Sequence, residues 1–197
     1  MIIALLGPKH SGKTSAGLEL ARRRGLPFFD LDRLIEERTG QSPRALYRAG
    51  PGLFRRAEEE ALAGLLKSPA GERGVLAAGG GIIDNPRALD LLFSSGESGR
   101  VLVYLAVTAE TAWRRIAGPG EDRELPPFLQ AESAAASREK HRFLHERRRA
   151  AYEALLAGPA SIPRIRVDGE GKTPAELAEE IEGLIFSLCL KYGILTL

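Results

Sequence analysis

A run of eight residues near the N-terminus has the composition of a phosphate-binding loop. Residues 7–14 read GPKHSGKT and fit the pattern G-x-x-x-x-G-K-[ST] without a mismatch. Glycines let backbone N–H groups close around phosphate oxygens, and the start of the following helix favours negative charge. We expect Lys13 to reach the outer phosphates and the Thr14 hydroxyl to bind Mg²⁺. The expected nucleoside triphosphate site consists of Gly7, Pro8, Lys9, His10, Ser11, Gly12, Lys13 and Thr14.

Two aspartates, Asp30 and Asp32, stand at the end of the second predicted strand. Residues two apart in an extended chain face the same side, so both carboxylates should face the space beside the phosphate loop. Such a pair can hold hydrated Mg²⁺ and can accept a proton from a hydroxyl nucleophile. The alternative is that the Asp-x-Asp sequence caps the helix that follows.

Three consecutive glycines follow the third predicted strand. Gly79, Gly80 and Gly81 would present backbone N–H groups with no side chain in the way, which suits close approach of the backbone to a ligand. A plain turn is the alternative.

Arg148 shares a helical stripe with Leu144 and Tyr152, so its guanidinium should face the protein. A guanidinium on an inward face needs an anion, which is either a ligand carboxylate or phosphate or the partner in a structural ion pair. Arg55 and Glu58, three residues apart near the start of their helix, form a second candidate pair.

Short apolar strands alternate with helices along the chain. This order predicts an α/β fold with a parallel sheet covered on both faces, and ligands of such sheets bind at the carboxyl ends of the strands. The predicted strands cover residues 1–6, 26–30, 74–78, 101–107 and 162–167. The predicted helices cover residues 15–24, 32–38, 43–49, 53–66, 86–94, 108–117, 132–156 and a last segment that begins with the capping-box sequence TPAE at 173–176.

Bulk properties limit the class of protein. A chain of 197 residues is most simply one domain, and a formal charge of +2 gives no overall field that would attract nucleic acid. Cys189 is the only cysteine, which indicates a reducing compartment. The first apolar run ends at a glycine after six residues, so it resembles neither a signal peptide nor a membrane span. We expect a cytoplasmic protein that binds neither nucleic acid nor membrane.

Residues 118–130 (GPGEDRELPPFLQ) interrupt the regular pattern with proline, glycine and a charged cluster around Arg123. A long irregular loop inside a regular fold is often a lid over a ligand site, and an ordinary surface loop is the alternative. A mobile arginine near a phosphate loop could stabilise the charge that develops in phosphoryl transfer.

These motifs together resemble those of the shikimate kinases, small P-loop phosphotransferases of aromatic amino-acid (chorismate) biosynthesis. The resemblance runs from residue 2 to about residue 185. Its distinctive parts, besides the phosphate loop, are FDLDRLIEERTG at 29–40, FRRxE at 54–58, the triple glycine at 79–81 and RxxxY at 148–152. A phosphate loop alone fits many unrelated enzymes, whereas the loop with all four other motifs in order is specific.

The resemblance implies a P-loop NTPase fold, a three-layer α/β/α sandwich with a five-stranded parallel sheet in the order 2-3-1-4-5 and a mobile lid. We expect residues 1–197 to form a single kinase domain. Within it, residues 31–66 would form the helical substrate-binding part and residues 117–131 the lid. The apolar tail, residues 188–197, would pack on the body or on a partner.

The resemblance also implies the reaction, which is Mg²⁺-dependent transfer of the ATP γ-phosphoryl group to the 3-hydroxyl of shikimate. Asp32 matches the aspartate that binds the substrate hydroxyls and is proposed to deprotonate the 3-hydroxyl. Asp30, with Thr14, matches the residue that holds Mg²⁺. The implied catalytic residues are Lys13, Asp32 and Arg123.

Substrate contacts carry over in the same way. Arg55 and Arg148 match the arginines that hold the shikimate carboxylate, and Gly79, Gly80 and Gly81 match its backbone contacts. Arg123 matches the lid arginine over the transferred phosphate. The nucleotide base is expected near residues 169–172, which include Lys172.

Several residues depart from the family pattern. Glu124 follows Arg123, and the lid reads RELPP where the family commonly has RPLL. His10 replaces a residue that is usually small. The alternatives to a shikimate kinase are another small-molecule kinase of the same fold, such as a gluconate kinase, and a nucleotide-binding regulatory module with little turnover. We expect a monomer, with self-association through the apolar tail as the alternative.

Overall fold

The computed structural model describes residues 1–94, 99–118, 125–158 and 162–192. Its strands form one sheet in the order β2-β3-β1-β4-β5, and every neighbouring pair is parallel. The strands are β1 (Ile2–Leu6), β2 (Phe28–Asp30), β3 (Gly74–Ala77), β4 (Arg100–Ala106) and β5 (Arg164–Asp168). The predicted α/β class and strand order are therefore confirmed.

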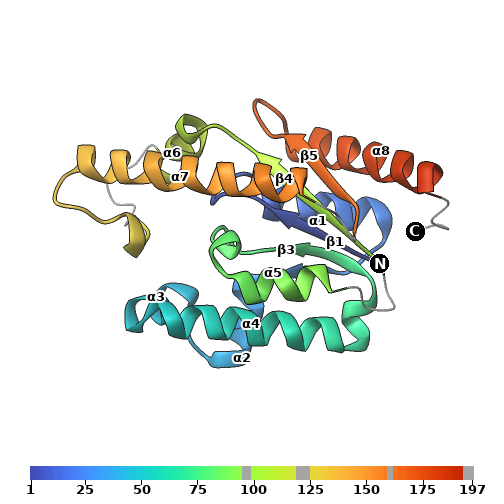
Figure 1. The fold of residues 1–197 in the computed structure, drawn as a ribbon, viewed down its shortest axis with the longest axis horizontal. Helices are drawn as coiled ribbons and strands as arrows, with labels where there is room; N and C mark the ends of the chain where they lie inside the picture. The colour runs from blue at the N-terminus through green and yellow to red at the C-terminus, as the bar shows by residue number, and fades with distance from the viewer. Residues whose placement is uncertain (95–98, 119–124, 159–161, 193–197) are drawn as a thin grey trace.

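Helices cover the sheet on both sides (Figure 1). The α-helices are α1 (Lys13–Arg24), α2 (Leu31–Thr39), α3 (Pro43–Ala49), α4 (Pro51–Lys67), α5 (Pro86–Phe93), α6 (Ala109–Ala117), α7 (Ala134–Ala157) and α8 (Pro174–Tyr192). The sequence did not indicate the short 3₁₀ helices, which are η1 (Pro69–Glu72), η2 (Ile82–Asp84) and η3 (Pro127–Leu129). None of the described helices is both long enough and apolar enough to span a membrane.

Side-chain caps set where several helices begin. The hydroxyls of Ser42 and Thr108 accept backbone hydrogen bonds at the starts of α3 and α6. At the start of α8, Glu176 accepts a hydrogen bond from the Thr173 backbone N–H at 2.8 Å, and the Thr173 hydroxyl accepts one from the Glu176 N–H at 3.3 Å. This is the capping box that the sequence predicted.

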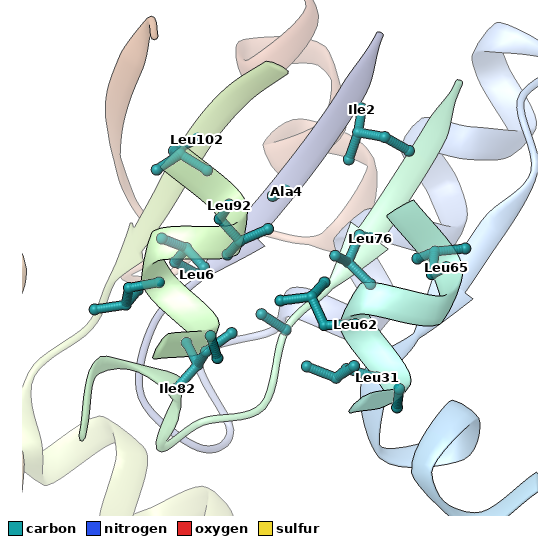
Figure 2. Close-up of a cluster of buried hydrophobic side chains, with 14 of the residues drawn as sticks. Ile2, Ala4, Leu6, Leu31, Leu62, Leu65, Leu76, Ile82, Leu92 and Leu102 are labelled. Carbon is teal, nitrogen blue, oxygen red and sulfur yellow. The ribbon is translucent and has the colours of Figure 1, made fainter. Parts of the chain in front are cut away.

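The central strand, β1, is buried on both faces, and its residues alternate between two cores. Ile2, Ala4 and Leu6 face a cluster that includes residues of α2, α4 and α5, while Ile3 and Leu5 face residues of α1 and α8. Figure 2 shows the first cluster, with Leu31, Leu62, Leu65, Leu76, Ile82, Leu92 and Leu102 around β1. Burial on both faces explains why the strand is uniformly apolar rather than alternating.

Parallel pairing brings the chemically distinctive segments to one edge of the sheet. The phosphate loop follows β1, Asp30 ends β2, and the three glycines follow β3. Because β1 pairs with β3 and β3 pairs with β2, these three strand ends are neighbours. The sheet therefore gathers residues that lie far apart in the sequence at the edge where ligands bind.

Candidate active site

The phosphate loop between β1 and α1 has a backbone that requires glycine. Gly7 has φ +142°, and a Cβ added there would lie 2.6 Å from the backbone oxygen of Leu105 in β4. Glycine alone avoids that clash at this backbone angle. The loop consequently packs tightly on the sheet, and the N-terminus of α1, which favours negative charge, opens onto the cleft beside it.

Lys13 is buried, and its amine lies inside the loop. Its Nζ donates hydrogen bonds to the carbonyl oxygens of Gly7 at 3.0 Å and Pro8 at 2.8 Å. Burial lowers the pKa of Lys13 to about 8, and the carboxylates of Asp32 and Asp30 oppose this shift. A partly desolvated amine bonded to neutral carbonyls is well prepared to bind phosphate oxygens.

Asp30 connects the phosphate loop to α2. Its Oδ2 accepts a hydrogen bond from the Thr14 hydroxyl at 3.0 Å, and its Oδ1 accepts one from the Asp32 backbone N–H at 3.0 Å, which caps α2. Hydroxyl and carboxylate oxygens are donors that Mg²⁺ prefers, so Thr14 and Asp30 fit that ion. The described residues contain no group of three or more His, Cys, Asp or Glu that could hold a metal.

Asp32 lies in the first turn of α2 rather than in extended chain. It still lines the same cleft as Asp30, because Asp30 ends β2 and the helix begins at the next residue. Burial of the carboxyl, and then the charge of Asp30, raises the pKa of Asp32, while Lys9 and Lys13 oppose the rise. The residue is exposed, and it lines the cleft. A carboxylate made more basic in this way is suited to accept a proton.

The cleft beside the loop has a volume of about 500 Å³. Its charged lining residues are Lys9, Lys13, Asp30, Asp32, Arg115 and Lys172. Four cations against two carboxylates make the cleft locally basic, although the whole chain carries only +2. The sequence analysis missed Arg115, whose Nη1 donates a hydrogen bond to the His10 carbonyl at 3.0 Å.

A smaller pocket of about 120 Å³, here called the acceptor pocket, adjoins the cleft. Lys9, Asp32 and Gly80 line both spaces, so ligands in the two would meet at these residues. One wall is aromatic and consists of Tyr47, Phe54 and Phe128, with Tyr47 6.1 Å from each of the other two rings. The other lining residues are Pro43, Arg44, Gly79, Gly81, Pro126, Pro127 and Arg148.

Arg148 faces the acceptor pocket from α7, as its helical stripe predicted. Its side chain is 15% exposed, against 52% for Arg147 and 53% for Arg149. Both an ion pair and a pocket position are present, because Arg148 pairs with Asp84 at 2.8 Å while lining the pocket. Its guanidinium also lies over the Phe128 ring, 5.4 Å from the centroid.

Two other expected site residues are not in this pocket. The Arg55 side chain is exposed and lines a separate surface depression with Asn85 and Arg87. Arg123 lies outside the described residues, as do the other residues of 119–124 in the expected lid. From residue 125 onward that segment is described, and Pro126, Pro127 and Phe128 form part of the acceptor-pocket wall.

The family model for shikimate kinase matches residues 9–184. The chain belongs to the shikimate kinase family. A shikimate kinase from Chlorobium chlorochromatii is 33% identical over 193 residues, covering 96% of this chain and 95% of that protein. The predicted family and its class, ATP-dependent kinase, are confirmed.

Solved structures agree with the shikimate kinase assignment. A shikimate kinase from Acinetobacter baumannii in complex with shikimate aligns with a TM-score of 0.74 and 30% identity, covering 94% of this chain and 93% of that one. A deoxyadenosine kinase from M. mycoides, at 16% identity and a TM-score of 0.54, shares the fold alone.

The carboxyl group of Glu58 is buried beside Gly79, the first of the three glycines that follow β3. Its Oε2 accepts a hydrogen bond from Asn85 Nδ2 at 2.9 Å, and its Oε1 has no partner among the described residues. Burial, which outweighs the Asn85 hydrogen bond, raises the pKa of Glu58 to about 7. Its expected pairing with Arg55 is not among the described ion pairs; Asn85 also donates to the Arg55 carbonyl at 3.1 Å.

Proposed function

We propose that the chain transfers the γ-phosphoryl group of ATP to the 3-hydroxyl of shikimate, giving shikimate 3-phosphate and ADP. Besides the family assignment, one observation carries the proposal. A basic cleft built on a phosphate loop adjoins a small pocket, and Lys9, Asp32 and Gly80 line both. A nucleotide in the first space and a small acceptor in the second would therefore meet at a basic carboxylate.

Asp32 is the proposed proton acceptor. A bond forms between the acceptor oxygen and the γ-phosphorus, the bond from that phosphorus to the β,γ-bridging oxygen breaks, and the hydroxyl proton passes to the Asp32 carboxylate. The positive charge of Lys13 stabilises the negative charge on the phosphate oxygens. Positioning and charge stabilisation supply most of the rate in such transfers, and both are functions of the loop described above.

Arg148 is the proposed anchor for the acceptor carboxylate. It is the inward-facing guanidinium of α7, and Gly79, Gly80 and Gly81 beside it leave their backbone open to the pocket. Arg55 enters the proposal through the family resemblance, because its exposed side chain lies on another part of the surface. Contact with the bound acceptor would require Arg55 to change its side-chain conformation.

Thr14 and Asp30 are the proposed protein ligands of Mg²⁺, since their oxygens are 3.0 Å apart beside the loop. When bound, the ion would neutralise charge on the phosphates. We assign Arg123 as a contact of the transferred phosphate. We assign Lys172 as a contact of the nucleotide, because it lines the cleft beside the phosphate loop. We further propose that residues 1–197 form one domain and that the protein is a cytoplasmic monomer. Size-exclusion chromatography would test the oligomeric state.

The test is ADP release with Mg²⁺-ATP, with and without shikimate, for the wild type and Asp32→Asn. We expect shikimate-dependent turnover in the wild type and a kcat lower by about 10²–10⁴-fold in the variant. Asp90→Asn, an exposed change on α5, is the charge-matched control and should keep wild-type kcat.

Three results would contradict the proposal. Turnover with gluconate but not shikimate would indicate another small-molecule kinase. ATP binding without turnover on any acceptor would favour a regulatory module. Wild-type kcat in Asp32→Asn would remove Asp32 as the proton acceptor.

A further inference from the structure

Asp84 lies just behind the wall of the acceptor pocket and bridges two consecutive arginines of α7. Its Oδ2 accepts a hydrogen bond from Arg148 Nε at 2.9 Å and forms an ion pair with Arg148 Nη2 at 2.8 Å. Its Oδ1 accepts a hydrogen bond from Arg147 Nη2 at 2.8 Å. The Asp84 side chain is 24% exposed. It belongs to η2, the short 3₁₀ helix that follows the three glycines.

The two contacts to Arg148 use one edge of its guanidinium. A guanidinium has five N–H donors, namely one on Nε and two on each terminal nitrogen. Asp84 accepts the Nε–H and makes an ion-pair contact with Nη2. The Nη1–H groups and the Nη2–H on the side away from Asp84 remain, and one from each nitrogen forms a parallel fork that matches a second carboxylate.

Two further contacts fix the plane of the same group. Arg148 Nη2 lies so close to Gly81 that a Cβ added to that glycine would be 3.1 Å from it. On the pocket side, the guanidinium lies over the Phe128 ring. The Arg148 side chain is thus held by a carboxylate at one edge, by backbone beside it and by an aromatic face.

We propose that Asp84 is a positioning residue for substrate binding: it holds the Nε edge of Arg148 so that the free fork meets the carboxylate of the acceptor. This inference rests on the proposed function. Asp84 also places one negative charge beside two adjacent arginines, which reduces the repulsion between them. Without it, the Nε edge of Arg148 would lose its carboxylate partner, and the guanidinium would lose its fixed orientation.

The test compares Asp84→Asn with the wild type by steady-state kinetics in both substrates. We expect the KM for shikimate to rise about tenfold, as for loss of a hydrogen-bonded charge pair, while kcat and the KM for ATP change less than twofold. Asp84→Glu, which keeps the charge, should recover most of the affinity. Asp90→Asn controls for loss of one negative charge on the same side of the fold.

A second acceptor separates positioning from a structural role. In the carboxamide analogue of shikimate the carboxylate is replaced by a neutral amide, so the fork of Arg148 has no charged partner. Asp84→Asn should then change kcat/KM for the analogue by less than twofold relative to the wild type. A general distortion of the pocket would instead lower kcat/KM for shikimate and for the analogue by the same factor.

The outcomes are distinguishable from failure of the proposed function. If the wild type does not use shikimate, the proposed function fails before Asp84 is tested. If the wild type uses shikimate but Asp84→Asn leaves its KM unchanged, the positioning role is wrong. A lower KM in the variant would also overturn it, because Asp84 would then be competing with the substrate for Arg148.

Discussion

The phosphate cleft and the acceptor pocket adjoin, but the chain builds them in different ways. Residues 9–15, one continuous stretch, form about half of the cleft lining. The acceptor pocket is assembled from single residues and short segments of α2, α3, α4, α7, the glycine turn and η3. A site made by one loop depends on local sequence, whereas a pocket made from many segments depends on the whole fold.

Their main cations also differ in surroundings. Lys13 is hydrogen-bonded to neutral backbone carbonyls, whereas Arg148 is paired with the carboxylate of Asp84. The Lys13 amine therefore has no carboxylate of the described residues in hydrogen-bonding contact and stays available for a polyanion. In the acceptor pocket, Asp84 offsets part of the charge, which suits a ligand with a single carboxylate.

The largest expected effect comes from the cleft. Lys13→Met removes the buried amine of the phosphate loop, and we expect kcat/KM for ATP to fall about 10³-fold, by analogy with the loss of a preorganised group that stabilises developing charge. Steady-state ADP release at varied ATP measures it. In the wild type, the same quantity should fall above pH 8, because the pKa of Lys13 is about 8 and the amine becomes neutral there.

Lys67→Met, at the exposed end of α4, is the matched control and should change nothing. If kcat/KM for ATP still falls above pH 8 in Lys13→Met, a group other than Lys13 titrates in the cleft. The proposed difference between Lys13 and Arg148 would then be wrong.

The next effect is on the free energy of unfolding and concerns Glu58, which lies beside Gly79 of the acceptor pocket. The pKa of Glu58 is about 7 in the folded state, above its ordinary value of 4.5, so the folded state binds the proton more tightly than the unfolded state. The stability from this group is complete below pH 4.5 and is lost as the pH rises through 7, by at most about 3 kcal/mol. Glu58→Gln, which stays neutral, should flatten that slope.

Urea denaturation of the wild type and Glu58→Gln at pH 5 and pH 8 measures this difference. The free energies of unfolding should lie close together at pH 5, with the variant relatively more stable at pH 8. Equal slopes in the two proteins would show that Glu58 does not titrate in this range.

Arg148→Lys tests the acceptor pocket directly. Lysine keeps the charge but has no planar fork, and it cannot hold Asp84 and a ligand carboxylate on two edges. We expect the KM for shikimate to rise about 10–30-fold with the KM for ATP unchanged. Arg149→Lys, one residue along and exposed, is the control. A rise in both KM values would mean that the two sites are not independent.

The sequence predicted the phosphate cleft more completely than the acceptor pocket. The phosphate loop, Asp30 and the parallel α/β sheet could be predicted, because apolar strands and glycine spacing are local signals. The strand order was implied by the family resemblance and not by these signals. The places of Arg44 in the pocket lining and of Asp84 behind Arg148 could not be predicted, since they depend on how α3 and η2 pack. Arg55 was expected from a motif and lies elsewhere on the surface, because a motif does not determine side-chain direction.

The smallest expected effect is at Gly80, which lines both sites. A Cβ there would lie 2.8 Å from the Lys9 backbone nitrogen, so Gly80→Ala must push the phosphate loop and the glycine turn apart. We expect both KM values to rise, each by about tenfold or less, as for a moderately overpacked contact. Gly183→Ala, on α8 with no neighbour within 4 Å of the added atom, should leave both unchanged. If Gly80→Ala raised only one KM, the boundary residue would belong to that site alone, and the proposed meeting point of the two ligands would have to move away from it.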